Sequence, residues 1–256
     1  MAFKKLKFWF DKDLARLLAD KILVVQPNFK DKSFIKNIDA KVHDLELKDR
    51  IAVFADELHE QLSNNYAKNI KILMKILGPE NKEGTGMFSN FYWIMPIAYY
   101  VEKYGLDDFK MSMQAIEAIT KRNTSEYAIR PFLERYPEKT LAQMIKWSTD
   151  KNFHVRRLSS EGIRPRLPWA KKMDAFIDNP TPILPILNNL KDDPEKYVQK
   201  SVANCLNDLV KDNLPIAKKM VEKWQKKPTP ERRWIIKHGL RRLLKADDKW
   251  AQQMVK

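Results

Sequence analysis

The sequence predicts an all-α fold, arranged as a curved α-solenoid of stacked helical pairs. Glycine is scarce, with 6 residues among 256, although sheet proteins need glycine-bearing turns throughout. Apolar residues recur at helical spacing from one end of the chain to the other. The second half also repeats one helical theme. The first two observations argue against an all-β fold. The third favours a solenoid over a single bundle, which would be amphipathic without regular spacing.

Helices are expected to follow one another along the whole chain. Leucine and isoleucine fall on one face of a helix over 12–24. The same spacing predicts helices around 51–62 and 70–77, and Gly78 with the proline after it ends the second. Residues 79–86 are polar and contain two glycines, which is typical of a surface loop. Further helices are predicted at 90–104, 107–121, 124–135, 138–150, 153–161, 171–177, 182–191, 194–210, 213–226 and 230–245.

An internal repeat runs through the second half of the chain. Its three copies cover 151–161, 194–208 and 229–244. Each copy follows a turn, carries cations in its first helical turns and then becomes apolar. Aligning Val155, Val198 and Ile235 gives spacings of 43 and 37 residues, near the roughly 40–47 residues of HEAT and armadillo repeats. We therefore expect one HEAT-like repeat domain over 1–256. Its N-terminal helices occupy 1–90, and its repeats in 91–256 carry a basic concave face.

The excess positive charge lies in the second part of the chain. The protein has 48 Lys and Arg against 33 Asp and Glu, a formal net charge of +15. Residues 151–256 hold 24 cations and 12 carboxylates, a net charge of +12, whereas residues 1–150 hold 24 and 21, a net charge of +3. This asymmetry indicates a polyanionic partner, with nucleic acid favoured over anionic lipid.

Composition excludes several classes of protein. The longest apolar run covers 91–101 and is interrupted by Pro96, whereas a membrane-spanning helix needs about 20 apolar residues. The one cysteine, Cys205, excludes an internal disulfide and indicates a reducing compartment, and no secretory leader is recognised. The four histidines are scattered without zinc-ligand spacing. We expect no membrane association and no metal.

The most distinctive segment covers 154–169 and reads His-Val-Arg-Arg-Leu-Ser-Ser-Glu-Gly-Ile-Arg-Pro-Arg-Leu-Pro-Trp. Gly162 marks the end of a helix that Glu161 closes, where a carboxylate opposes the helix dipole. Surrounding cations would make this tolerable, and four are at hand: Arg156, Arg157, Arg164 and Arg166. Two prolines stiffen the following loop and hold Trp169 at a fixed position. A structural salt bridge and a core tryptophan are the alternative interpretation.

A basic stripe is predicted on the last repeat helix. Arg233, Lys237 and Arg241 are spaced four residues apart, and Lys196 and Lys200 show the same spacing one repeat earlier. Like charges at this spacing repel by about 0.2–0.5 kcal/mol per pair, so we expect an anion to share the surface. DNA phosphates would supply that anion. An ordinary solvated helix face is the alternative.

Carboxylates set among these cations need a separate explanation. Asp208 ends its repeat much as Glu161 ends the earlier one. Glu126 follows Thr124 and Ser125, either of which would cap a helix with Glu126 in its first turn. A carboxylate in a DNA-binding cleft repels phosphate, so it is expected to meet a cation. An alkylated base is cationic, and so is the sugar while its glycosidic bond breaks. This chemistry favours an N-glycosidase, although arginine pairing would explain the same charges.

Longer motifs carry a family resemblance. The matching stretches, in chain order, are 45–50, 76–79, 119–133, 154–169, 201–208 and 233–241. On them the chain resembles the AlkC branch of the bacterial DNA alkylation-repair glycosylases, relatives of AlkD built from HEAT-like repeats. The resemblance implies a monofunctional enzyme of base excision repair that acts on double-stranded DNA. It implies release of 3-methyladenine and 3-methylcytosine without a cofactor or deep base flipping. We expect a cytoplasmic, nucleoid-associated monomer.

The resemblance also assigns site residues. Glu161 matches the catalytic carboxylate, Glu126 and Asp208 match the other acids of the cleft, and Trp169 matches the aromatic residue near the lesion. Glu161 is expected to stabilise the developing sugar cation and to place a water, assisted by Asp208 or Glu126. Phosphate contacts are expected from Arg156, Arg157, Arg164, Arg166, Lys196, Lys200, Arg233, Lys237 and Arg241. Some relatives carry an immunoglobulin-like domain after the repeats, which we expect this chain to lack.

Two other functions fit the same sequence. A non-catalytic nucleic-acid-binding module would use the same basic face and release no base. A protein-binding scaffold would show neither base release nor salt-sensitive DNA binding, and would expose an apolar groove. Three carboxylates in a basic setting favour the enzyme. This expectation requires that Glu161 is not locked in a buried arginine pair without access to solvent.

Overall fold

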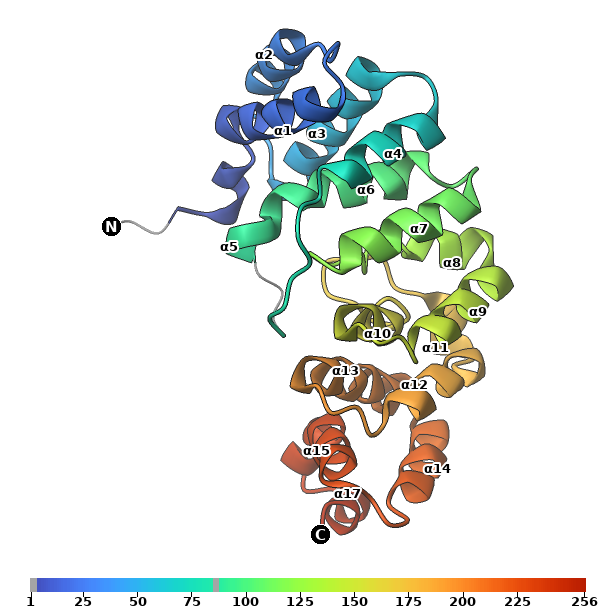
Figure 1. The fold of residues 1–256 in the computed structure, drawn as a ribbon. Helices are drawn as coiled ribbons and strands as arrows, with labels where there is room; N and C mark the ends of the chain where they lie inside the picture. Colours follow the sequence, from blue (N-terminus) through green and yellow to red (C-terminus); the bar gives the residue numbers. More distant parts are fainter. Residues whose placement is uncertain (1–3, 85–87) are drawn as a thin grey trace. The chain divides into compact units, whose positions relative to one another are not determined.

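The computed structural model describes residues 4–84 and 88–256, and it divides into two compact units, Met1–Arg135 and Tyr136–Lys256. Over the described residues the regular elements are α-helices and short 3-10 helices, without strands (Figure 1). The all-α prediction is therefore confirmed. Within the same residues, no helix combines the length and the apolar character that a bilayer span requires.

The first unit is built from helices that pack in pairs, some adjacent in the chain and others three elements apart or more. Its elements are η1 (Leu6–Trp9), α1 (Lys12–Val25), α2 (Asp31–Lys41), α3 (Leu47–Leu62), α4 (Tyr66–Lys75), α5 (Phe88–Phe91), η2 (Tyr92–Ile94), α6 (Met95–Tyr104), α7 (Phe109–Thr120) and α8 (Arg130–Arg135). The helix α1 packs on α2, α3 on α6, and α4 on α7. Their apolar faces, with Leu18, Phe54 and Ile70 fully buried, form the core of the unit.

A buried arginine closes the N-terminal part of this unit. Arg50 on α3 is 3% exposed and donates to three backbone carbonyls, those of Leu45 (2.9 Å), Phe10 (3.2 Å) and His43 (2.7 Å). These bonds satisfy the guanidinium and the carbonyls together, as a buried polar group requires. The motif 45–50 is therefore accounted for by folding.

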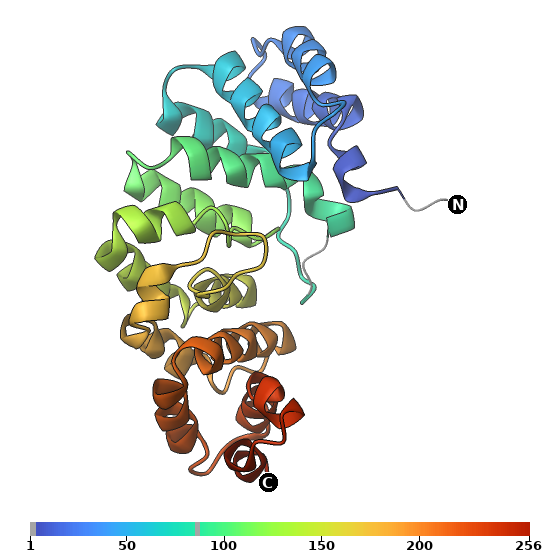
Figure 2. The same ribbon diagram turned by 180° about the vertical axis from the view of Figure 1, so that it is seen from behind.

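The second unit is centred on one long helix. Its elements are α9 (Pro137–Trp147), α10 (Phe153–Glu161), α11 (Asp174–Asp178), η3 (Thr181–Ile183), α12 (Leu184–Leu190), α13 (Lys196–Asp212), α14 (Leu214–Trp224), α15 (Pro230–Gly239), α16 (Arg241–Lys245) and α17 (Lys249–Met254). The helix α13 packs against α10, α14 and α15. Figure 2 shows the reverse side, with the yellow connection between α10 and α11 in view.

Side-chain hydrogen bonds join successive repeats of this unit. The Ser160 and Ser201 hydroxyls lie 2.7 Å apart, and Asn189 donates to the Ser148 hydroxyl at 2.8 Å. In both pairs the partners are 41 residues apart, close to the repeat length that the sequence indicates. Polar groups thus pair across the interface between stacked helices, where water is excluded.

Two sequence predictions about helices are corrected, and one helix is present that was not predicted. The helix expected at 124–135 begins only at Arg130, because Pro131 is tolerated in a first turn and not in a helix interior. Residues 126–129 form a turn instead. The helix expected at 230–245 is two helices, interrupted at Leu240 (φ −85°, ψ 3°). The helix α2 was not predicted, since only Phe34 and Ile38 are buried on it.

The loop predicted at 79–86 is confirmed over 79–84, which contains no helix. Its last two residues, 85 and 86, lie outside the described residues. The next described helix, α5, begins at Phe88.

Candidate functional site

The helices α10, α13 and α15 carry most of the predicted site residues. The Asn152 side chain caps α10 by accepting from the N–H groups of His154 and Val155, and the helix ends at Glu161 as predicted. The Thr229 side chain caps α15. Because α13 packs against both neighbours, side chains from successive repeats meet along its length.

One arginine joins the two predicted carboxylates of this unit. Arg164 Nη1 lies 2.7 Å from Glu161 Oε1, and Arg164 Nε lies 2.9 Å from Asp208 Oδ2. A second arginine, Arg157, places Nη2 3.5 Å from Glu161 Oε1 and its guanidinium carbon 5.0 Å from the ring centroid of Tyr197. We call Arg157, Glu161, Arg164 and Asp208 the acid–arginine cluster. Formally it holds two negative and two positive charges.

Burial and pairing set the proton affinities within the acid–arginine cluster. Burial opposes ionisation of Glu161, but Arg157, Arg164 and a hydrogen bond from Ser201 outweigh it, so the pKa of Glu161 is lowered. Burial raises the pKa of Asp208, and Arg164 offsets this only in part. For Arg164, burial is outweighed by Glu161 and Asp208, and its pKa is raised. The cluster therefore holds a firmly ionised Glu161 beside a more basic Asp208.

The surroundings of Glu161 differ from the open cleft that the sequence suggests. The Glu161 and Asp208 side chains are 6% and 8% exposed. The arginine pairing that the sequence allowed as an alternative is present, and the charge of Glu161 is compensated by Arg157 and Arg164. The condition set for Glu161 is therefore met only in part, through the 6% of its side chain that stays exposed. Two compensating arginines weaken the negative field that Glu161 presents outside the cluster.

The loop after α10 presents Trp169. The indole is 76% exposed, which rules out a core tryptophan. Its φ of 61° lies in the left-handed region, which costs a bulky residue roughly 1–2 kcal/mol. Ile163 and Leu167 anchor the loop in the core, and the Arg166 backbone donates to the Asp208 carboxylate. A strained, exposed aromatic on an anchored loop is typical of a contact site.

Glu126 belongs to the first unit, in the turn before α8. The prediction of a capped first helical turn is wrong there, because α8 begins four residues later. The Thr124 hydroxyl donates to Glu126 Oε2 and also accepts from the Glu126 backbone N–H at 3.4 Å. The catalytic role that the sequence assigns to Glu126, together with Glu161 and Asp208, stays a prediction.

Besides Arg157 and Arg164, two more of the predicted phosphate-binding arginines have carboxylate partners. Arg156 makes a bidentate contact with Asp193, through Nε at 2.6 Å and Nη2 at 3.1 Å. Arg166 grips Asp212 at 2.7 Å through both Nε and Nη2. Asp193 and Asp212 are 3% and 7% exposed. Fork-like pairs of this kind use the arginine donors that a phosphate would need.

The predicted phosphate-binding side chains of α13, α15 and α16 form no ion pair among the described residues, unlike Arg232 of α15, which pairs with Asp192. Lys200, Arg233 and Lys237 are exposed, and they make no ion pair within the described residues. Arg241 does not continue their helix face, because it follows the interruption at Leu240 and donates to the Asn204 side chain at 3.0 Å. The predicted stripe is thus shortened.

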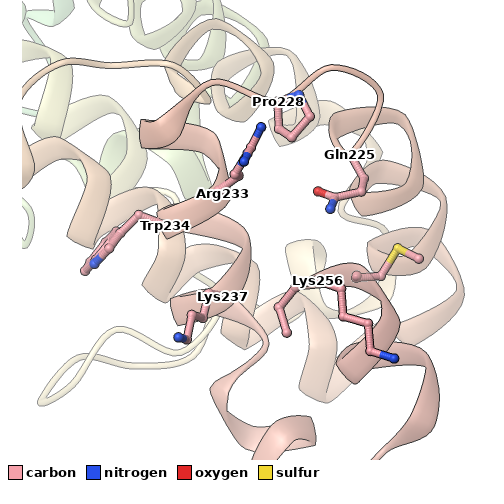
Figure 3. Close-up of a pocket in the computed structure, with 8 residues that line it drawn as sticks. Gln225, Pro228, Arg233, Trp234, Lys237 and Lys256 are labelled. Carbon is pink, nitrogen blue, oxygen red and sulfur yellow. The ribbon is translucent and has the colours of Figure 1, made fainter.

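A pocket of about 440 Å³ lies beside α15 (Figure 3). It is lined by Gln225, Pro228, Arg233, Trp234, Lys237, Met254, Val255 and Lys256. Three of these side chains are cationic and none is acidic. No residue of the acid–arginine cluster lines this pocket. The pocket is therefore a basic feature beside α15, and it does not enclose the predicted carboxylates.

Sequence reasoning missed the polar partners of the site residues. Asp193, Ser201 and Asp212 were not singled out, although they hold Arg156, Glu161 and Arg166. The signal for two of them is spacing, since Asp193 and Asp212 lie 37 and 46 residues after their arginines. These separations bracket the repeat length. No trio of His, Cys, Asp or Glu in the described residues is arranged to hold a metal ion.

The fold and these charged helices define an all-helical repeat protein with a basic surface and a buried acid–arginine cluster. The family model of the DNA alkylation repair enzymes matches residues 97–243. The chain belongs to this family.

Two known proteins are similar over nearly the whole chain. The uncharacterized protein YhaZ of Bacillus subtilis (strain 168) is 39% identical over 247 residues, which cover 96% of this chain and 66% of YhaZ. The alkylpurine DNA glycosylase AlkC of Pseudomonas fluorescens, solved bound to DNA containing an abasic site analog, is 35% identical with a TM-score of 0.88. That match covers 98% of this chain and 67% of AlkC. The chain thus spans about two thirds of the length of each protein.

Proposed function

We propose that this protein is a monofunctional DNA glycosylase that releases cationic alkylated bases from double-stranded DNA in base excision repair. The observation that carries the proposal is the acid–arginine cluster, which holds Glu161 and Asp208 on one arginine in a chain of the alkylation-repair family. The similarity to an alkylpurine DNA glycosylase supports this reaction class. We propose 3-methyladenine and 3-methylcytosine as substrates.

The reaction requires a negative charge near the sugar rather than a general acid. The alkylated base already carries a positive charge, so it leaves as a neutral molecule when the N-glycosidic bond breaks. The bond electrons go to the base, and positive charge grows on the deoxyribose. Water adds to that sugar carbon and loses a proton to a carboxylate. Glu161, whose pKa is lowered, supplies the counter-charge, and Asp208, whose pKa is raised, takes the proton.

DNA binding makes the Glu161 charge available in this proposal. Arg157 is the looser partner, at 3.5 Å from Glu161 against 2.7 Å for Arg164. A phosphate that attracts Arg157 leaves Glu161 with one arginine, and the carboxylate then exerts a stronger field on the sugar. Trp169 contacts the lesion or sugar through its π face, where positive charge is favoured. Glu126 assists, and no deep pocket receives the base.

The test is incubation of the purified protein with methylated genomic DNA, followed by chromatographic identification of the released bases. We expect free 3-methyladenine and 3-methylcytosine above the spontaneous background, without added metal. The absence of any released base, with DNA binding intact, would reject the glycosylase proposal.

The second candidate is a non-catalytic DNA-binding module. The exposed cations Lys200, Arg233 and Lys237 favour it, because phosphate contact alone explains them. Such a module would bind DNA with a steep salt dependence and release nothing in the same assay. Absence of both activities would instead favour a protein-binding scaffold.

A further inference from the structure

Trp234 on α15 organises a group of cations that the proposed reaction does not use. Lys196 Nζ on α13 lies 3.1 Å from the centroid of the Trp234 ring. The imidazole of His238 stacks on the same indole, with centroids 4.7 Å apart and ring planes 12° apart. Lys200 lies one turn after Lys196 on α13. The indole therefore fixes two nitrogen-bearing side chains on adjoining helices.

The cations around His238 disfavour its protonated, positively charged form. Burial lowers the pKa of His238, and the positive charges of Arg241, Lys196 and Lys200 lower it further. Burial and Lys200 likewise lower the pKa of Lys196, while Glu231 acts in the opposite direction. Within the described residues, neither the ring nitrogens of His238 nor the ammonium of Lys200 has a hydrogen-bond partner. Crowded donors of one charge sign favour a bound anion.

We propose that Lys196, Lys200 and His238 form an anion-binding site that takes a phosphate of the DNA backbone. The choice of a DNA phosphate rests on the proposed glycosylase function. The site adjoins the basic wall of the pocket, since Trp234 and Lys237 lie on one edge of it (Figure 3). A strand held by this site would continue past exposed cations of α15. We call Lys196, Lys200 and His238, together with the indole of Trp234, the Trp234 site.

Phosphate binding at the Trp234 site is coupled to protonation of His238. In the free protein, burial and the neighbouring cations favour the neutral imidazole, because they lower the pKa of His238. A phosphate next to the ring favours the imidazolium and raises that pKa. The gain in DNA affinity from protonation of His238 is fully present below the His238 pKa of the free protein. It is lost as pH rises through the higher His238 pKa of the DNA-bound protein.

The experiment follows the His238 titration by NMR in the full chain, with and without an undamaged DNA duplex. We expect DNA to raise the pKa of His238. A rise of about one pH unit corresponds to a roughly tenfold difference in DNA affinity between the two protonation states. Inorganic phosphate is the second probe. An unchanged pKa with DNA would overturn the proposal, as would a rise with inorganic phosphate that DNA does not reproduce.

Variants connect this titration to DNA affinity. H238Q is expected to bind the duplex as wild type does at pH 8 and to lose the gain at pH 5.5. H43Q is the control, because His43 lies in the first unit, 3.8 Å from Asp39, and is 72% exposed; it should keep the wild-type pH dependence. Equal pH dependence in H238Q and wild type would contradict the site.

The duplex contains no damaged base, so this experiment is independent of base release. A DNA-raised His238 pKa in a protein that releases no base would reject the glycosylase and keep the anion site. Base release by a protein in which DNA leaves the His238 pKa unchanged would keep the glycosylase and reject the anion site.

Discussion

The acid–arginine cluster and the Trp234 site use charge in opposite ways, although both involve α13. In the cluster, Glu161 and Asp208 are buried against arginines at 2.7 and 2.9 Å. At the Trp234 site, His238 experiences only cations, and no carboxylate pairs with Lys200 in the described part of the chain. One region pairs its charges internally, whereas at the other the Glu231 carboxylate acts only against part of the repulsion on Lys196.

The difference indicates which region is built to hold geometry and which to receive a ligand. Burying a charge pair is costly, and removal of one partner leaves the other charge buried and unpaired. Cations near a surface cost little alone and bind an external anion readily. We therefore assign positioning of the reacting sugar to the acid–arginine cluster and phosphate binding to α13 and α15.

The largest expected effect follows removal of the shared arginine. R164M leaves two buried carboxylates without their common partner, and we expect it to lower the free energy of unfolding by about 3–5 kcal/mol. R166M is the control, because Arg166 pairs with Asp212 and its side chain is 26% exposed. Urea unfolding measures both. Equal losses would contradict a special role for Arg164.

The exposed cations are expected to govern the salt dependence of DNA binding. Replacing Lys200, Arg233 and Lys237 with Ala should flatten the plot of log affinity against log salt, by about 0.9 for each phosphate that is no longer neutralised. The matched control replaces Lys219, Lys223 and Lys226, three exposed lysines on or next to α14, and removes the same total charge. If both triple variants change the slope equally, phosphate contact is not localised on α13 and α15.

Strain at Trp169 separates stability from activity. W169G relieves the left-handed backbone (φ 61°) and should leave the free energy of unfolding within about 1 kcal/mol of wild type, while the rate of base release falls about tenfold. K227G is the control, since Lys227 has a φ of 52° and no predicted role. Normal base release by W169G would remove Trp169 from the site.

The smallest effect concerns pH and Glu161. The pKa of Glu161 is lowered from 4.5, so its stabilising contribution is present above pH 4.5 and is lost as pH falls through the folded-state value. The stability difference between wild type and E161Q should therefore narrow in acid. Urea midpoints compared at pH 7 and pH 4 measure it, and a constant difference would mean that Glu161 is not stabilised as an anion.

Local sequence rules predicted features that depend on nearby residues. The end of α10 at Glu161 follows from Gly162 and the apolar spacing before it. The same rules place the start of α8 too early, because Thr124 and Ser125 match a helix cap. The ring of Pro131 is excluded from a helix interior, and the helix begins at Arg130.

Features that depend on tertiary pairing were not predictable by those rules. The sequence showed arginines around Glu161, but not that Arg156 belongs to Asp193 and Arg166 to Asp212. Burial decides these pairs, and a linear pattern does not report burial. Likewise, no sequence signal places Trp169 at positive φ. The repeat spacing does indicate roughly where the carboxylate partners of Arg156 and Arg166 fall in the sequence.

The most direct measurement of the central claim is single-turnover release of 3-methyladenine by E161Q, with binding to the same methylated DNA measured in parallel. We expect base release to fall by at least about a hundredfold, with DNA binding unchanged or tighter because a negative charge is removed. D193N, which alters a similarly buried ion pair outside the acid–arginine cluster, should release base at the wild-type rate. Release by E161Q at the wild-type rate would contradict the assignment of Glu161 as the counter-charge to the sugar.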